Sequence, residues 1–387
     1  MDNNSGCNWC GNKMIRGNAG GSMNKEVSEE KTSEIAREFF LGEFSFDELE
    51  YVPANLSKGD KKELADLIID FGDNIIAFQI KGRRGEPVPG GDKKWVERKI
   101  TDAKNQLVNT WEQYRDYEIP QFINGKGDSC MLKARGIYTG IIILYNEAIE
   151  DYKRIVSCNR IDGQFQCFTY NDFRVCCEKL VIPRDIIEYL EFRKQIIKPD
   201  KICSVDEELM AEEFLHRKYG TSNFGPHELD TFRWFLKNYQ SRLVEGECNQ
   251  YRDILQIFLE LDRAGIDAFS QRIANIIDLA RKKNVSDSNY IVPQDKNSSS
   301  FLFLASNEFD KEYIERLMFL FMYKTKSNKC LSVVAYFKNE DDIDFRLDWI
   351  YIEKDWEYDE VLEEICDSPE VKKKWNPALI LTHKVNK

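Results

Sequence analysis

Two neighbouring segments, residues 63–70 and 74–81, show the two-residue alternation of side chains that is typical of β-strands, and the tight turn Phe-Gly-Asp-Asn joins them. We therefore predict a β-hairpin. Asp66 interrupts the apolar run of the first strand, and Gln79 and Lys81 end an apolar run in the second. A carboxylate, an amide oxygen and an ammonium group that converge at strand ends can hold a divalent cation and a phosphate together.

The pattern up to residue 198 predicts that this hairpin belongs to an α/β domain. A continuous apolar run at 136–145 predicts a central strand that is buried on both faces. A stripe of apolar residues at helical spacing in 93–115 predicts a long helix that packs on the core. The other predicted elements are a helix at 28–42, a strand at 44–52, a strand at 164–169 and a helix at 183–195.

After residue 198 the pattern becomes helical between about 203 and 283, and a polar stretch at 284–300 is interpreted as a linker. We interpret the acidic residues 206–208 as a solvated helix face. Strands and helices then alternate, which predicts a second α/β unit. The predicted parts are a flexible N-terminal segment at 1–22, an α/β domain at 23–198, a helical domain at 199–290 and a small α/β domain of unknown role at 291–387.

Asp66, a gap of twelve residues and the sequence Gln79-Ile80-Lys81 resemble the D…(D/E/Q)-x-K core of the PD-(D/E)xK nuclease superfamily. The glutamine makes the chain similar to the branch that includes the Mrr-type restriction enzymes. That family places the motif on a β-hairpin between two helices, and the predicted order agrees. The resemblance covers less than half of the chain and implies a restriction-endonuclease-like mixed sheet flanked by helices.

The resemblance implies a role for each residue of the motif. Asp66 would anchor a metal ion, Mg²⁺ or Mn²⁺, together with the side-chain oxygen of Gln79 and the carbonyl oxygen of Ile80. Lys81 would orient or help to deprotonate the attacking water. A glutamate of the first helix often reaches the metal in the family, so Glu34 is a further candidate, with a solvated glutamate as an equal alternative. The implied activity is metal-dependent DNA endonuclease activity.

The formal net charge of −12 argues against a protein that coats nucleic acid non-specifically, but the charge near the motif is basic. From Lys81 to Lys104 there are eight basic residues and four acidic ones. We expect these basic side chains to contact DNA phosphates, with a solvated helix face as the alternative. The candidates are Arg83, Arg84, Lys93, Lys94 and Lys99, together with Gln106, which falls where relatives of the family often carry a helix glutamine close to the active site.

Gln79 leaves one negative charge fewer on the metal than the usual acidic residue. A domain that no longer cleaves DNA is therefore an alternative, and a structural Asp66–Lys81 pair would look identical in the sequence. The alternative function is an inactive nuclease-like scaffold that binds or senses DNA or a partner. By analogy with restriction enzymes we expect a role in defence against foreign DNA, and an oligomer or a separate regulatory protein is compatible with the sequence.

The cysteines and the apolar runs bear on the compartment. Eleven irregularly spaced cysteines are typical of reduced thiols rather than of a disulfide framework. The apolar runs are too short for a membrane span and no signal peptide is evident, so we expect a cytoplasmic protein that has no membrane partner. Cys7 and Cys10 have the spacing of half a zinc site, but no second pair follows, and a disordered tail is the alternative.

Overall fold

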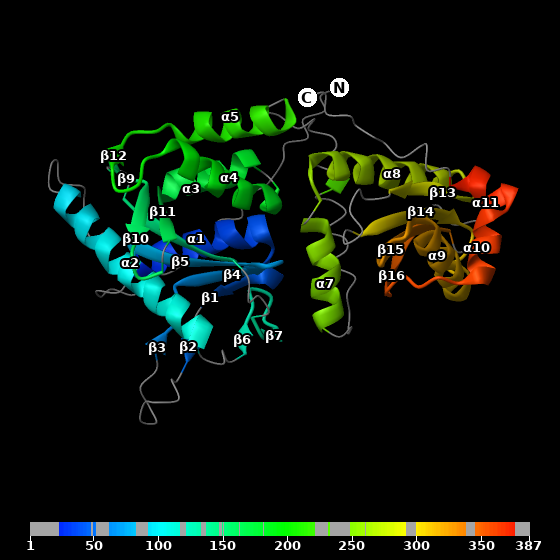
Figure 1. The fold of residues 1–387 in the computed structure, drawn as a ribbon, viewed down its shortest axis with the longest axis horizontal. Coiled ribbons are helices and arrows are strands. Elements are labelled where there is room, and N and C mark those ends of the chain that lie inside the picture. The colour runs from blue at the N-terminus through cyan, green and yellow to red at the C-terminus, as the bar shows by residue number, and fades with distance from the viewer. Residues whose placement is uncertain are drawn as a thin grey trace, which may run out of the picture.

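The computed structural model describes residues 23–47, 49–51, 62–82, 92–116, 121–132, 137–146, 149, 151–161, 163–180, 182–220, 231–232, 248–259, 261–291, 299–337 and 345–375. These residues form a mixed α/β protein in which helices flank two larger β-sheets (Figure 1). Cys7 and Cys10 lie outside them. Among the described helices, none combines the length and the apolar character that a membrane crossing requires.

The first sheet has six strands, and its central strands are parallel. In sheet order they are β1 (Ser45–Asp47), β4 (Leu67–Phe71), β5 (Asn74–Gly82), β8 (Ile137–Tyr145), β11 (Gly163–Thr169) and β10 (Ile155–Cys158). The strands β5, β8 and β11 run parallel, whereas β1, β4 and β10 are antiparallel to their neighbours. The carboxyl ends of β5, β8 and β11 therefore meet at one edge, which is where open α/β sheets commonly bind ligands.

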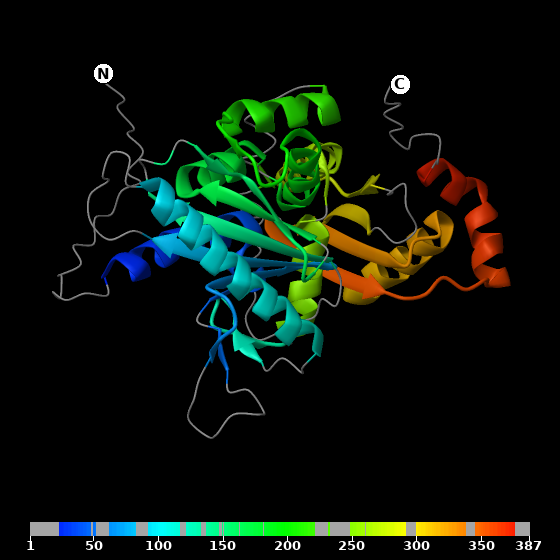
Figure 2. The ribbon, with the colours of Figure 1, turned by 60° about the vertical axis from the view of Figure 1, so that its left-hand side comes forward.

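Helices cover both faces of this sheet. The helices α1 (Met23–Phe40) and α3 (Tyr170–Leu180) pack on one face, and α2 (Asp92–Asp116) packs on the other. Figure 2 shows α2 crossing the front of the strands. The helices α4 (Pro183–Ile196) and α5 (Glu207–Tyr219) pack on α3. The hairpin and its neighbours thus lie between two helical layers.

The side chains of β5 alternate between the two layers, as strand geometry requires. Phe78 packs on Phe173 of α3, whereas Ala77 belongs to the cluster that contains Ala103 of α2. On β8, a Cβ atom at Gly140 would lie 2.3 Å from the ring of Phe165 in β11. Glycine is therefore required where these two strands and α2 approach one another.

Short elements connect this sheet. They are the 3₁₀ turn η1 (Gly42–Phe44) and three strand pairs: β2 (Glu50–Tyr51) with β3 (Lys62–Glu63), β6 (Phe122–Ile123) with β7 (Ser129–Cys130), and β9 (Tyr152–Lys153) with β12 (Ile202–Cys203).

The second sheet has four strands in the order β13-β14-β15-β16, and β14 and β15 are parallel. Helix α8 packs on one face and α9 on the other. The elements of this part are α7 (Cys248–Leu259), α8 (Arg263–Arg281), β13 (Ser286–Ile291), β14 (Ser300–Ser306), α9 (Lys311–Thr325), β15 (Lys329–Tyr336), β16 (Arg346–Glu353), α10 (Glu360–Asp367) and α11 (Pro369–Lys374).

One hydrophobic cluster continues from the first sheet into the second. It includes Phe40 of α1, Phe258 of α7 and Phe301 of β14. A buried ion pair reinforces this junction, because the guanidinium of Arg252 in α7 lies 2.7 Å from the carboxylate of Asp70 in β4. The same guanidinium donates a 3.0 Å hydrogen bond to the carbonyl of Asp70. Helix α7 is thus fixed directly to the strand that follows Asp66.

The predicted hairpin, the long helix α2 and the central strand β8 are confirmed, and Gly72 takes a positive φ of 59° in the hairpin turn. The first hairpin strand starts at Leu67 rather than at residue 63, because Glu63 pairs with β2. The strand predicted at 44–52 is divided into β1 and β2. Treating 284–300 only as a linker is wrong, since β13 forms the edge of the second sheet.

Candidate active site

Asp66 lies where the β4–β5 ladder ends. The register pairs Leu67 with Phe78, and the backbone N–H of Asp66 donates to the carbonyl of Phe78 at 3.2 Å. Beyond this point the side-chain carboxylate of Asp66, rather than a backbone carbonyl, accepts the hydrogen bond from the backbone N–H of Ile80, at 2.5 Å. The side chain of Asp66 is only 2% exposed. Its carboxylate is therefore held rigidly against the end of β5.

Gln79 and Lys81 are two residues apart on β5, so both side chains point to the α2 side of the sheet. The ammonium of Lys81 donates a 2.8 Å hydrogen bond to Oε1 of Gln79. It also lies 3.5 Å from Oδ2 of Asp66. Asp66, Gln79 and Lys81, which we call the trio, are thus brought together as the sequence predicts.

The trio is largely shielded from water. The side chain of Lys81 is 10% exposed, and Gln79 as a whole is 3% exposed. A lysine in such a place is costly unless its charge is compensated, and the carboxylate of Asp66 supplies the opposite charge. The ammonium bridges two side-chain oxygens, which are also the atoms that a bound metal ion would use.

Three oxygens at this place could serve a divalent cation: a carboxylate oxygen of Asp66, Oε1 of Gln79 and the carbonyl of Ile80. The N–H of Ile80 points toward Asp66, and in an antiparallel ladder the carbonyl of the same residue faces the same neighbour. An all-oxygen set suits Mg²⁺, which usually keeps several waters and completes its shell with substrate phosphate. The residues therefore fit such an ion in kind, with a single formal negative charge.

Acidic clusters do not compensate for this low charge in the described part of the chain. Nowhere among those residues do three or more His, Cys, Asp or Glu side chains gather in a way that could hold a metal ion. At the trio there is no such acidic group because position 79 is a glutamine rather than an acidic residue. Any cation there would depend on waters or on a phosphate for the rest of its ligands.

Glu34 does not join the trio. It is exposed on α1 and makes no hydrogen bond or ion pair with Asp66, Gln79 or Lys81. Its nearest electrostatic effect is on Tyr170, whose pKa is raised first by burial and, to a smaller extent, by Tyr145 and Glu34. The solvated alternative describes Glu34 in this structure.

The predicted DNA contacts lie partly outside the described residues. Arg83 and Arg84 lie outside the described residues, so the structure does not place them. Lys93 and Lys94 are exposed in the first turn of α2. The remaining two candidates lie further along the same helix: Lys99 pairs with Asp102 at 3.6 Å, and Gln106 is exposed.

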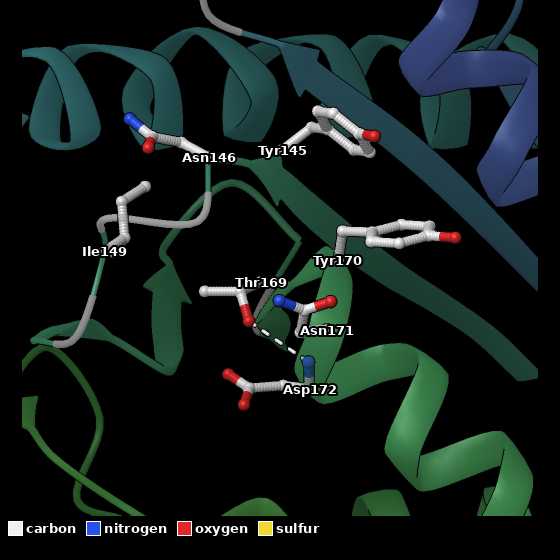
Figure 3. A pocket seen from close by; sticks show the side chains of 7 residues that line it. All are labelled: Tyr145, Asn146, Ile149, Thr169, Tyr170, Asn171 and Asp172. Atoms are coloured by element: carbon white, nitrogen blue, oxygen red, sulfur yellow. Dashed lines mark hydrogen bonds between the residues drawn. The ribbon is translucent and has the colours of Figure 1, made fainter. Parts of the chain in front are cut away.

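A pocket that the sequence did not predict lies where β8 and β11 end, at the carboxyl edge of the first sheet (Figure 3). Its volume is about 200 Å³. The lining residues follow β8 or surround the junction of β11 with α3: Tyr145, Asn146, Ile149, Thr169, Tyr170, Asn171 and Asp172. Finding it required the knowledge that β8 and β11 are parallel neighbours, because only then do their ends come together.

A buried charge network lies behind this pocket and was also missed. Glu207, interpreted from the sequence as part of a solvated face, is 2% exposed. Its carboxylate pairs with Arg154 at 3.0 Å and with Arg193 at 2.8 Å, and it accepts a 2.5 Å hydrogen bond from Tyr189. Burial lowers the pKa of Arg193, but Glu207, Tyr189 and Tyr152 together raise it more, so the net shift of this pKa is upward. The solvated interpretation of Glu207 is therefore wrong.

Arg154 links this network to the pocket. Its guanidinium lies 3.0 Å from the carboxylate of Asp172, which also accepts a 2.7 Å hydrogen bond from the hydroxyl of Tyr152. That hydroxyl in turn accepts from the backbone N–H of Thr169 at 3.0 Å. The end of β11 and the start of α3 are therefore fixed by buried polar contacts.

Comparison of the chain with protein-family models, with curated proteins and with solved structures found no match.

Proposed function

We propose that this protein is a metal-dependent endonuclease that hydrolyses DNA phosphodiester bonds, and that its first sheet and flanking helices form a restriction-endonuclease-like domain. The observation that supports the proposal is the meeting of Asp66, Gln79 and Lys81 at the end of the β4–β5 hairpin. The order of helix, hairpin, helix and parallel strand agrees with the resemblance in the sequence.

Asp66, Gln79 and the carbonyl of Ile80 would hold Mg²⁺ or Mn²⁺. When bound, this ion supplies positive charge to the phosphoryl oxygens and to the leaving oxygen. Lys81 carries hydrogen-bond donors on the same face, so it orients the attacking water and stabilises the negative charge on the phosphate. The hydrogen bond from Ile80 to Asp66 keeps the carboxylate in one orientation while the substrate binds.

The substrate contacts come from α2 and from the residues that precede it in the sequence. Lys93 and Lys94 are exposed on the helix that covers the trio face of the sheet, and Arg83 and Arg84 follow Lys81 in the sequence. Positive charge at such positions binds phosphates and positions the duplex without reading its sequence. A role in defence against foreign DNA, with a regulatory partner or oligomer, extends the proposal by analogy with restriction enzymes.

The proposal is tested by cleavage of plasmid and linear DNA by the full chain in Mg²⁺, in Mn²⁺ and in EDTA. Asp66→Ala and Lys81→Ala should each abolish metal-dependent cleavage. The matched controls are Asp278→Ala and Lys282→Ala, because Asp278 and Lys282 form an exposed Asp–Lys pair of 2.6 Å on α8. Equal cleavage by all five proteins would exclude the trio as the active site.

A second function has one observation in its favour. The Lys81 ammonium already bridges Gln79 and Asp66, which are the side chains a metal would need. A closed trio of this kind suits a nuclease-like scaffold that binds DNA or a partner without cleaving it. A folded protein that binds no Mg²⁺ in calorimetry and cleaves no DNA in any metal would favour this scaffold.

A further inference from the structure

The pocket at the ends of β8 and β11 lies along the edge where the three parallel strands end. Register pairs Lys81 with Leu144 and Gly82 with Tyr145, so the first pocket residue is next to the end of β5. Neighbouring strands are about 4.8 Å apart, which places the end of β11 about 10 Å from β5. The trio points to the α2 face of the sheet, whereas the ring of Tyr145 lies on the α1 face, where Lys31 binds its hydroxyl. A polynucleotide held at the trio therefore reaches the pocket by crossing the carboxyl edge of the sheet.

Aromatic side chains form one side of the pocket. The rings of Tyr145 and Tyr170 have centroids 5.0 Å apart and are tilted by 56° (Figure 3). The ammonium of Lys31 donates a 2.9 Å hydrogen bond to the hydroxyl of Tyr145 and fixes that ring. Aromatic rings at such positions stack on nucleobases of any sequence. The pocket thus offers a surface for a flat ring.

Polar groups on the other lining residues suit the edge of such a ring. Asn146 and Asn171 contribute carboxamides, each with a donor and an acceptor, and Thr169 contributes a hydroxyl. Asn171 is exposed, and its amide makes no hydrogen bond to any other residue that the structure describes. Carboxamides pair well with the donor and acceptor pattern of base edges.

The Lys31 ammonium contacts the pocket through the hydroxyl of Tyr145, but the lining residues themselves favour a base over a phosphate. The seven lining residues include no lysine or arginine. The one carboxylate among them, Asp172, is neutralised by Arg154 at 3.0 Å, so it does not repel a polyanion strongly. A volume of about 200 Å³ equals the space of about seven water molecules, which suits one heterocycle.

We propose that this pocket binds one unpaired nucleobase of the strand whose phosphate lies at the trio. The inference rests on the proposed nuclease function and specifies its substrate: a single strand, or a duplex from which one base is turned out of the stack. The tyrosine rings stack on the base, and the asparagine amides bind its edge.

Binding is measured by fluorescence anisotropy with the full chain in EDTA, so that no probe is cleaved. The probes are a labelled single-stranded oligodeoxynucleotide, an abasic strand of the same length, an intact duplex and a duplex with one mismatch. Stacking of one base contributes about 1–3 kcal/mol, so we expect the base-bearing strand to bind about 5- to 150-fold more tightly than the abasic strand. Tighter binding of the mismatched duplex than of the intact one would identify a base turned out of a duplex, and preference for the single strand alone would identify an unpaired strand.

Three variants test the residues. Tyr145→Ala should bind the base-bearing strand as weakly as the abasic one, whereas Tyr145→Phe should retain the difference because it keeps the ring. Asn171→Ala changes an exposed side chain and should not disturb the fold. It should weaken binding of the base-bearing strand several-fold. Tyr358→Ala, at a tyrosine that is 68% exposed near α10, is the matched control and should behave as wild type.

Two results would show that the pocket does not bind a nucleobase. One is equal binding of the base-bearing and abasic strands by wild type. The other is an unchanged preference for the base-bearing strand in Tyr145→Ala and Asn171→Ala. The cleavage and binding assays distinguish a failure of this inference from a failure of the proposed nuclease function. Cleavage that depends on Asp66 without any base preference would reject the pocket and keep the nuclease. A base preference that depends on Tyr145, in a protein that cleaves nothing in any metal, would keep the pocket and reject the nuclease.

Discussion

The ammonium of Lys81 lies 2.8 Å from Oε1 of Gln79, at the position where the motif that this sequence resembles usually has a carboxylate. With an amide there, only Asp66 opposes the positive charge of Lys81 within the trio. In the proposed function, the lysine and a divalent cation would therefore compete for the same oxygens. This competition makes two substitutions informative.

Gln79→Glu adds a negative charge at the site and should tighten Mg²⁺ binding by about tenfold or more, since unit charges about 4 Å apart near a protein surface attract by several kcal/mol. Titration calorimetry with Mg²⁺ measures this directly. Gln271→Glu, an equivalent change at an exposed position of α8, should leave the affinity unchanged. An equal Mg²⁺ affinity in wild type and Gln79→Glu would contradict the assignment of Gln79 as a ligand.

Lys81→Met removes the competing ammonium while keeping the length of the side chain. We expect Mg²⁺ to bind more tightly and cleavage to fall at least a hundredfold, because the donors that hold water and phosphate are lost. Parallel calorimetry and cleavage assays check both effects. Loss of metal binding together with loss of thermal stability would instead point to a purely structural lysine.

Glu207→Gln should destabilise the fold by about 3–5 kcal/mol, because it leaves the buried guanidinium groups of Arg154 and Arg193 without their shared counter-charge. Urea unfolding followed by circular dichroism measures this loss. The neighbouring variant Glu208→Gln is the control. The side chain of Glu208 is 52% exposed and pairs with Lys179, so the loss should be below about 1 kcal/mol. Equal losses in the two variants would contradict the network.

Arg252→Met should destabilise the protein by about 3–5 kcal/mol, because the carboxylate of Asp70 then loses the guanidinium that compensates it in the interior. The double variant Asp70→Leu, Arg252→Met should recover part of this loss, since it also removes the buried carboxylate. Arg217→Met, at an exposed ion pair with Glu213, is the control. Denaturant unfolding checks all three variants, and an Arg252→Met protein as stable as the control would show that the Asp70–Arg252 ion pair does not stabilise the fold.

Asp185 predicts a pH dependence. Burial raises the pKa of its carboxyl group above the ordinary value, although Lys218 and Tyr219 act in the opposite direction. The folded state therefore binds this proton more tightly than the unfolded state. The stabilisation that results is present below the unfolded pKa of about 3.9 and is lost as the pH rises through the raised folded value.

Wild type should accordingly lose stability relative to Asp185→Asn as the pH rises from about 4 to 7. Unfolding free energies measured in urea at a series of pH values test this. Glu188→Gln, at an exposed residue that contacts the same lysine, is the control. A wild type that instead gains stability relative to Asp185→Asn as the pH rises would show that the Lys218 pair outweighs burial.

The trio was predictable because it breaks a local rule. Polar residues at Asp66, Gln79 and Lys81 interrupt the apolar pattern of two strands, and the short turn between those strands fixes which residues face each other. Local patterns sufficed here. The long helix α2 and the strand β8 were predictable for the same reason, since each has one strong periodicity over its whole length.

The features that the sequence did not predict depend on distant partners. Glu207 looks like any acidic residue at the start of a helix, and its burial depends on Arg154, fifty-three residues earlier. The pocket depends on the parallel pairing of β8 with β11, which no short motif records. The strand β13 lies at the edge of its sheet, and its sequence is mostly polar. It therefore lacks the apolar alternation by which a strand is recognised in a sequence.

The ion pair between Asp70 and Arg252 has a mechanical consequence. Asp66 precedes the five-residue strand β4 and Asp70 is four residues further on, so the trio and α7 hold opposite ends of one stiff segment. A shift of α7 would therefore move Asp66 through the strand rather than through a loop. Because the second sheet shares its hydrophobic cluster with α7, the position of Asp66 depends on how that sheet packs.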